Sequence, residues 1–100
     1  MVNRYIVYED AALDFEKIIH YITNKLKNPE GSLWLTELFE KKFNSIVSFP
    51  YAYPVIVDAK LEIDELRKCS LNNYLIIYYI NEELEQVEVV RIVYQREDFL

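Results

Sequence analysis

The alternation of apolar and polar residues predicts a strand at the start of the chain and a helix directly after it. Segment 4–8 is rich in β-branched and aromatic residues, which favour an extended strand. Glu9 and Asp10 follow, and acidic residues at this place can cap a helix and interact with its positive end. Apolar residues then recur at steps of three and four, which predicts one core-facing stripe made of Ala12, Phe15, Ile19, Ile22 and Leu26.

A second helix is expected immediately after the first. Asn28-Pro29-Glu30 both ends the first helix and suits the start of another, with Asn as the cap and Pro at the first helical position. Phe49-Pro50 ends this second helix. Its predicted core stripe, which the stem of Lys42 crosses, is Leu35, Leu38, Phe39, Ile46 and Phe49.

The last third of the chain predicts three strands, at 65–71, 74–80 and 86–94, joined by two short polar turns. Segment 74–80 is apolar throughout, so this strand is expected to lie inside the sheet. The preceding stretch, from Tyr51 to about Asp64, has no periodicity and predicts a loop that is either functional or lies across the sheet edge. We therefore expect an α+β fold of order β-α-α-β-β-β, in which a two-helix hairpin packs on one face of a mainly antiparallel four-stranded sheet.

Length and composition indicate a single domain over residues 1–100. A hydrophobic fraction of 52% is ample for one core, and 100 residues are too few for two. The sequence contains no apolar run long enough for a membrane span and no secretory leader pattern, and Cys69 has no second cysteine with which to form an internal disulfide. We expect a cytoplasmic protein without membrane contact. Its net charge of −6 argues against simple affinity for nucleic acid.

Few residues suggest enzyme chemistry. With one glycine, one cysteine and one histidine, the chain lacks a phosphate-binding loop, a Cys/His metal cluster and a Ser/His/Asp triad, so no cofactor or metal is expected. The histidine, His20, is expected at the surface. Isolated bases interrupt the apolar C-terminal strands instead, namely Arg67, Lys68, Arg91 and Arg96.

Arg91 is the most informative of these bases. On two-residue alternation it shares a face with Val87, Val89 and Val93, so it either pairs with a carboxylate or lines a site, and both alternatives remain open. If Arg67 and Arg91 both point away from the helices, their backbones are about 10 Å apart and the side chains can converge. Two guanidinium groups so placed could hold one phosphate.

Several segments together resemble one family, and their order and spacing extend over nearly the whole chain. They are 5–7, 11–18, Tyr21-Ile22, Asn28-Pro29, Phe49-Pro50, Tyr53-Pro54, Leu66-Arg67-Lys68, 73–78 and 89–98. The resemblance is to the RelE/ParE toxins of type II toxin–antitoxin systems, which also function in plasmid stabilisation. It implies the same β-α-α-β-β-β fold and a cognate antitoxin whose C-terminal segment wraps the toxin.

The resemblance leaves the target open, because RelE-like members cleave mRNA on the ribosome while ParE-like members inhibit DNA gyrase. Our main expectation is growth arrest by ribosome-dependent mRNA cleavage, carried out by a metal-independent endoribonuclease. In this interpretation Arg67 and Arg91 match the basic strand positions of the family and stabilise the phosphorane, while Tyr94 and Arg96 are the tail groups nearest the reaction.

The alternatives are a gyrase inhibitor that acts by binding without catalysis, and a toxin-fold protein of weak activity. Two features favour an alternative. Tyr94 stands where many nuclease members have histidine, and a phenol with a pKa near 10 is a poor base at neutral pH. In addition, the acidic charge is unsuited to docking on ribosomal RNA.

Overall fold

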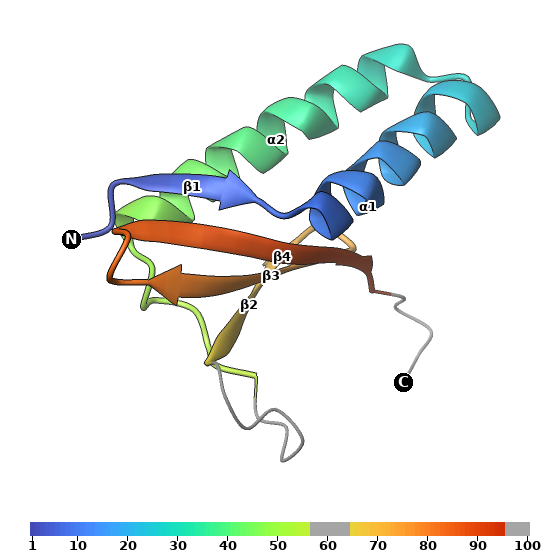
Figure 1. Cartoon of the computed structure of the whole chain (residues 1–100). Helices are drawn as coiled ribbons and strands as arrows, with labels where there is room; N and C mark the ends of the chain where they lie inside the picture. The colour runs from blue at the N-terminus through green and yellow to red at the C-terminus, as the bar shows by residue number, and fades with distance from the viewer. Residues whose placement is uncertain (57–64, 96–100) are drawn as a thin grey trace.

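The computed structural model describes residues 1–56 and 65–95, and the elements within them follow the predicted β-α-α-β-β-β order (Figure 1). A short π-helical turn, η1 (Tyr21–Lys25), extends the first helix. The other elements are β1 (Arg4–Val7), α1 (Glu9–His20), α2 (Pro29–Ser48), β2 (Leu66–Leu71), β3 (Tyr74–Asn81) and β4 (Gln86–Tyr94). The predicted fold class is confirmed, and the three C-terminal strands begin and end within one residue of the predicted positions.

The helical hairpin forms where the sequence places a stop and a new start. Lys27 adopts a left-handed backbone with φ of 50°, which turns the chain, and the Asn28 side chain accepts the Gly31 N–H at 3.0 Å as the cap of α2. The hydroxyls of Thr23 and Ser32 lie 2.6 Å apart and join the two arms of the hairpin. The hairpin is therefore held at its closed end by hydrogen bonds between polar side chains.

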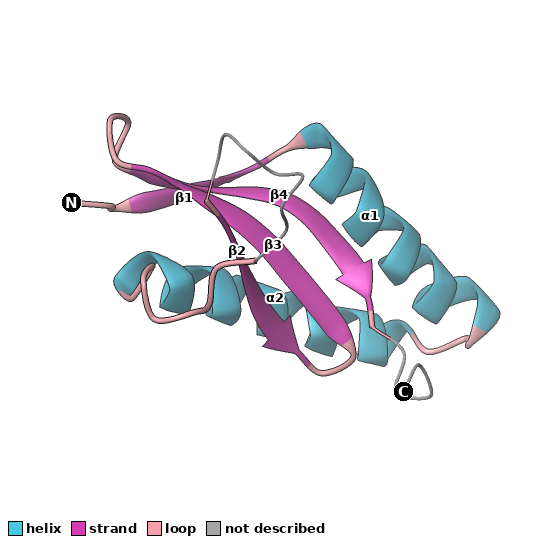
Figure 2. Ribbon diagram, turned by 90° about the horizontal axis from the view of Figure 1, so that it is seen from below, coloured by secondary structure: helices cyan, strands magenta, loops and turns pink. Residues whose placement is uncertain are grey.

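The four strands form one mixed sheet of order β1-β4-β3-β2, and the helices of the described residues lie on one face of it (Figure 2). β1 runs parallel to β4, whereas the β2–β3 and β3–β4 pairs are antiparallel. Tyr78 of β3 is fully buried under the helices, and its hydroxyl donates to the carbonyl of Pro50 at 2.6 Å. This bond ties the centre of the sheet to the end of α2.

The core stripe predicted for the first helix was partly wrong. Phe15 and Ile22 pack against the core, but Ala12 and Leu26 are exposed, and Ala11 is buried instead. The π-helical geometry of η1, in which residues advance by a smaller angle than in a regular α-helix, moves Leu26 off the core face. Ala11 and Ala12 lie before this turn, where α1 packs on β4.

In α2, the core-facing stripe was predicted correctly within the helix and wrongly at its C-terminal end. Leu35, Phe39 and Ile46 are buried, while Phe49 is 67% exposed. Phe43, which the predicted stripe omits, is buried and packs its ring against Tyr5 of β1 at 5.1 Å between centroids. The helix ends at Ser48, so Phe49 no longer follows the helical face.

A β-bulge in β4 reverses the expected orientation of Arg91. Tyr78 lies opposite Val89, but the preceding residue of β3, Ile77, lies opposite Arg91, which leaves Val90 as the extra residue. Arg91 is therefore on the sheet face opposite to that of Val89. The prediction that it shares a face with the preceding valines was wrong, because the bulge interrupts the two-residue period.

The chain after α2 lies along the outer edge of β2. Val55 forms a bridge with Arg67, the Ile56 N–H donates to the Leu66 carbonyl at 2.7 Å, and the Lys68 N–H donates to the Pro54 carbonyl at 3.1 Å. This part of the predicted loop lies across the sheet edge, while positions 57–64 lie outside the described residues. No helix of the described part of the chain is long and apolar enough to cross a membrane.

Candidate functional site

Arg67 lies on the helix side of the sheet. It is directly opposite the buried Tyr78, and its side chain is 13% exposed. Nη1 donates to the Tyr53 carbonyl at 2.7 Å, and the guanidinium carbon lies 5.0 Å from the centroid of the Tyr51 ring. Nη2 is 3.8 Å from a carboxylate oxygen of Glu65. These contacts hold the segment after α2 against β2.

Arg91 is paired with a carboxylate, the first of the two alternatives that the sequence left open. Its Nε and Nη2 donate to the two oxygens of Asp14 at 2.7 and 2.9 Å. Asp14 Oδ2 also accepts the backbone N–H of Ile92 at 3.0 Å. Because β1 pairs with β4 only as far as Val89, this α1 carboxylate satisfies the β4 edge where the neighbouring strand has ended.

The two arginines do not converge. Arg67 lies in a cross-strand row with Tyr78 and Val89, whereas Arg91 lies in the adjacent row and on the other face. The base that shares a row with Arg91 is Lys68, separated from it by Ile77. The condition for a phosphate held between the two guanidinium groups is thus not met. Sequence reasoning missed the Lys68–Arg91 row because the bulge could not be seen in the alternation.

The tail residues lie elsewhere. Tyr94 ends β4, is 60% exposed, and packs its ring at 5.6 Å from that of Tyr74. The following residue, Gln95, donates its N–H to the carbonyl of Asn73 at 2.5 Å, which fixes the end of the strand. Arg96 lies outside the described residues. A catalytic role for Arg67, Arg91, Tyr94 and Arg96 stays a prediction.

A second polar cluster, which sequence analysis did not find, surrounds the buried Glu88. Its carboxylate accepts hydrogen bonds from the Tyr8 hydroxyl at 2.5 Å, Gln86 Nε2 at 2.8 Å and Asn81 Nδ2 at 2.9 Å. Burial works to raise the pKa of Glu88, but the hydrogen bonds together outweigh it and hold the pKa below its ordinary value. Gln86 in turn accepts from Arg4 Nε at 3.0 Å. The cluster joins β1, β3 and β4 on the helix-free face.

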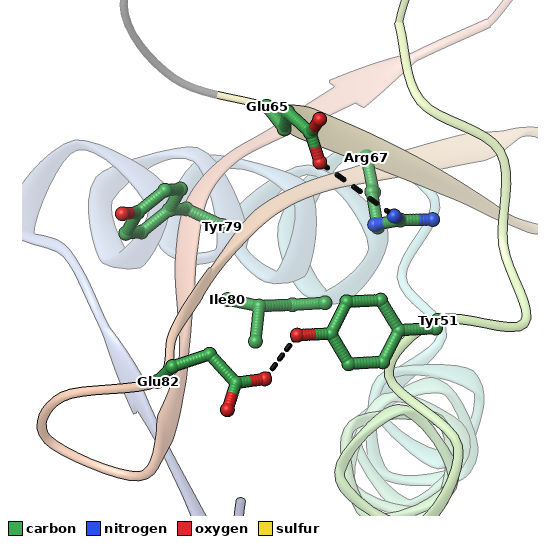
Figure 3. A pocket seen from close by; sticks show the side chains of 6 residues that line it. All are labelled: Tyr51, Glu65, Arg67, Tyr79, Ile80 and Glu82. Carbon is green, nitrogen blue, oxygen red and sulfur yellow. Dashed lines mark hydrogen bonds and ion pairs between the residues drawn. The ribbon is translucent and has the colours of Figure 1, made fainter.

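Among the described residues are two hollows that adjoin these groups. The first is an apolar groove of about 280 Å³ between α1 and α2, which we call the interhelical groove. Its residues are Tyr5 and Val7 of β1, Ala12 and Phe15 of α1, Thr36, Phe39, Glu40 and Phe43 of α2, and Ile92 of β4. The second is a cleft of about 290 Å³ at the end of β2, lined by Tyr51, Glu65, Arg67, Tyr79, Ile80 and Glu82 (Figure 3).

The model of the ParE toxin of the parDE type II toxin–antitoxin system matches residues 5–99. The chain belongs to this ParE toxin family. A solved structure described as the chromosomal ParDE TA system from P. aeruginosa shares the ParE toxin fold, with a TM-score of 0.72 at 15% identity over 96% of this chain and 98% of that one. No curated protein sequence matches. As part of a toxin–antitoxin system, a ParE toxin has an antitoxin as its partner.

The Asp14–Arg91 pair provides a stability prediction for this ParE toxin. The Asp14→Ala variant should lose about 2 kcal/mol of unfolding free energy, because it removes a charged acceptor and leaves the Ile92 N–H without its partner. Arg91→Ala should lose less, since half of the arginine side chain is exposed whereas Asp14 is 14% exposed. Urea denaturation of both variants measures this order. An equal or larger loss in Arg91→Ala would contradict the assignment of Asp14 as the edge cap.

Proposed function

We propose that this toxin acts by binding DNA gyrase and not by cutting mRNA. The observation that carries the proposal is that two of the three arginines expected at a cleavage site, Arg67 and Arg91, are engaged in contacts that hold the fold. Arg67 is nearly buried against Tyr51 and the Tyr53 carbonyl, and Arg91 pairs with Asp14. The match to the ParE toxin family supports the same interpretation.

Metal-independent RNA cleavage needs a base, an acid and a cation near one phosphate. Among the described residues expected at the cleavage site, the candidate base is the Tyr94 phenol, and a phenol is a weaker general base at neutral pH than an imidazole. Inhibition by binding needs none of these groups, and a net charge of −6 does not oppose docking on a protein surface. Inhibition by binding therefore needs fewer specialised side chains than RNA cleavage, and the described residues are compatible with it.

We further propose that the antitoxin occupies the interhelical groove. Seven of the nine residues around it have apolar or aromatic side chains and come from four elements, and they include Phe15, Phe39 and Phe43. The groove is open to solvent. An amphipathic segment that places apolar side chains between α1 and α2 would bury this surface. The groove has one carboxylate, Glu40, which would face a polar or basic position of the segment.

A supercoiling assay with purified toxin tests the gyrase proposal. Supercoiling of relaxed plasmid should fall with toxin concentration, cleaved plasmid should accumulate, and premixing with antitoxin should restore supercoiling. At a temperature where it is folded, the Arg91→Ala variant should inhibit gyrase as strongly as the parent, because Arg91 contributes to the stability of the fold and not to target binding. Primer extension on transcripts is the matched control, and it should show no new 5′ ends.

Two results would overturn the proposal. Unchanged supercoiling at saturating toxin would exclude gyrase as the target. New transcript ends within codons, dependent on ribosomes and lost in Arg91→Ala at a temperature where that variant is folded, would restore the cleavage interpretation. Normal growth on expression without antitoxin would contradict both and favour a toxin-fold protein of weak activity.

A further inference from the structure

The cleft of about 290 Å³ at the end of β2 is lined by apolar, aromatic and charged side chains. Its base is Ile80, which is 9% exposed, and two tyrosines, Tyr51 and Tyr79, contribute to its lining (Figure 3). Glu65 and Glu82 complete the lining together with Arg67, from opposite sides of the opening. An apolar base, aromatic rings and carboxylates thus come together in one hollow.

The charge around this cleft favours a cation. Arg67 is 13% exposed and lies against the Tyr51 ring, with Tyr53 and Glu65 as further partners, so its charge is already compensated within the protein. The exposed carboxylate of Glu82, by contrast, forms no ion pair with a base among the described residues. The exposed Glu83 beside it extends the negative charge along the β3–β4 turn. An incoming anion, nucleic acid included, would meet this negative rim, whereas a positive group would be attracted.

The Tyr51 hydroxyl donates to Glu82 Oε1 across the cleft, which holds the ring and the carboxylate together. This contact raises the pKa of Tyr51. A lysine or arginine side chain suits the resulting geometry. Its aliphatic stem would lie on Ile80, and its charged end would reach Glu82 beside an aromatic ring.

We propose that this cleft receives one lysine or arginine side chain from a protein partner. The inference deepens the proposed function, because it treats the toxin as a protein that works through contacts with other proteins and assigns the chemistry of one such contact. The site lies at the β2 end of the sheet, so it is separate from the interhelical groove, with which it shares no lining residue.

Titration of the ¹⁵N-labelled chain with Nα-acetyl-arginine methylamide tests the proposal by NMR. Amide shifts should change at Tyr79, Ile80 and Glu82 with millimolar affinity. The neutral citrulline analogue should leave these amides unchanged, because it has the same stem and no charge. The isosteric variant Glu82→Gln, which keeps an acceptor for the Tyr51 hydroxyl, should bind the arginine probe about fivefold more weakly.

Glu83→Gln is the matched control, because it removes the same charge from the same turn and does not line the cleft. It should bind the probe nearly as well as the parent chain. Equal binding of the citrulline analogue, an equal loss in both variants, or no shift at any probe concentration would each overturn the proposal. Neither gyrase nor antitoxin enters this titration, so its failure and a failure of the supercoiling assay can be told apart.

Discussion

Replacing Glu88 by glutamine should lower the unfolding free energy by about 3 kcal/mol, a large share of the stability of a domain of this size. The wild-type carboxylate is 6% exposed and accepts from Tyr8, Gln86 and Asn81. Glutamine at this position has a single acceptor atom and adds an NH₂ group among donors, so at least one buried donor loses its partner. Thermal unfolding should show a decrease in Tm of about 15 °C.

Glu85→Gln is the control for this experiment, because it makes the same change in the neighbouring turn. The Glu85 carboxylate is half-exposed and contacts the chain terminus and Asn3. The Tm of this variant should be close to that of the parent. Tyr8→Phe, which removes one of the three donors, should show an intermediate loss. A Glu88→Gln variant as stable as Glu85→Gln would contradict the view that the cluster holds β1 in the sheet.

Two carboxylates in separate clusters make stability depend on pH. Glu88 and Asp14 both have a folded-state pKa below the ordinary values of 4.5 and 3.8. For Asp14 the leading cause is the hydrogen bond with Arg91. A lowered pKa means that each contribution is present in full above the ordinary value and is lost as the pH falls through the folded-state value. The difference in stability between wild type and Asp14→Ala should therefore shrink below about pH 4.

Local chemistry explains why so much of this fold could be predicted. The Asn28-Pro29 cap, the unbroken apolar run 74–80 and the polar turns of the last third act over a few residues, so the sequence alone places these elements. The stripe of the first helix was harder to predict beyond His20, because the π-helical turn there alters the angular step. No local residue pattern in this segment predicts a π-helical turn.

The candidate site was less predictable because it depends on contacts between distant segments. Arg91 and Asp14 are 77 residues apart, and their pairing follows from the end of β1 and the bulge at Val90. Likewise Glu88 looks like an outward-facing strand residue until Tyr8 is brought over it by the parallel β1–β4 pairing. Alternation predicts the face of a residue only where the strand is regular.

The interhelical groove leads to the second large prediction. Ala12→Glu should weaken antitoxin binding about 100-fold, or ~2.7 kcal/mol, because it puts a carboxylate into an apolar groove that already contains Glu40. The fold should be preserved, since Ala12 is exposed and glutamate near the start of α1 interacts favourably with the helix dipole. Isothermal titration of the purified variant with antitoxin measures the loss.

Leu13→Glu provides the matched comparison, because it introduces the same charge one position further along α1, at a side chain that is 47% exposed and does not line the groove. It should bind antitoxin nearly as tightly as the parent. In cells, Ala12→Glu should remain toxic when antitoxin is co-expressed, whereas Leu13→Glu should be neutralised. If Ala12→Glu binds antitoxin like the parent while Leu13→Glu is weakened, the antitoxin must occupy the outer face of α1, and the interhelical groove would be excluded as its binding site.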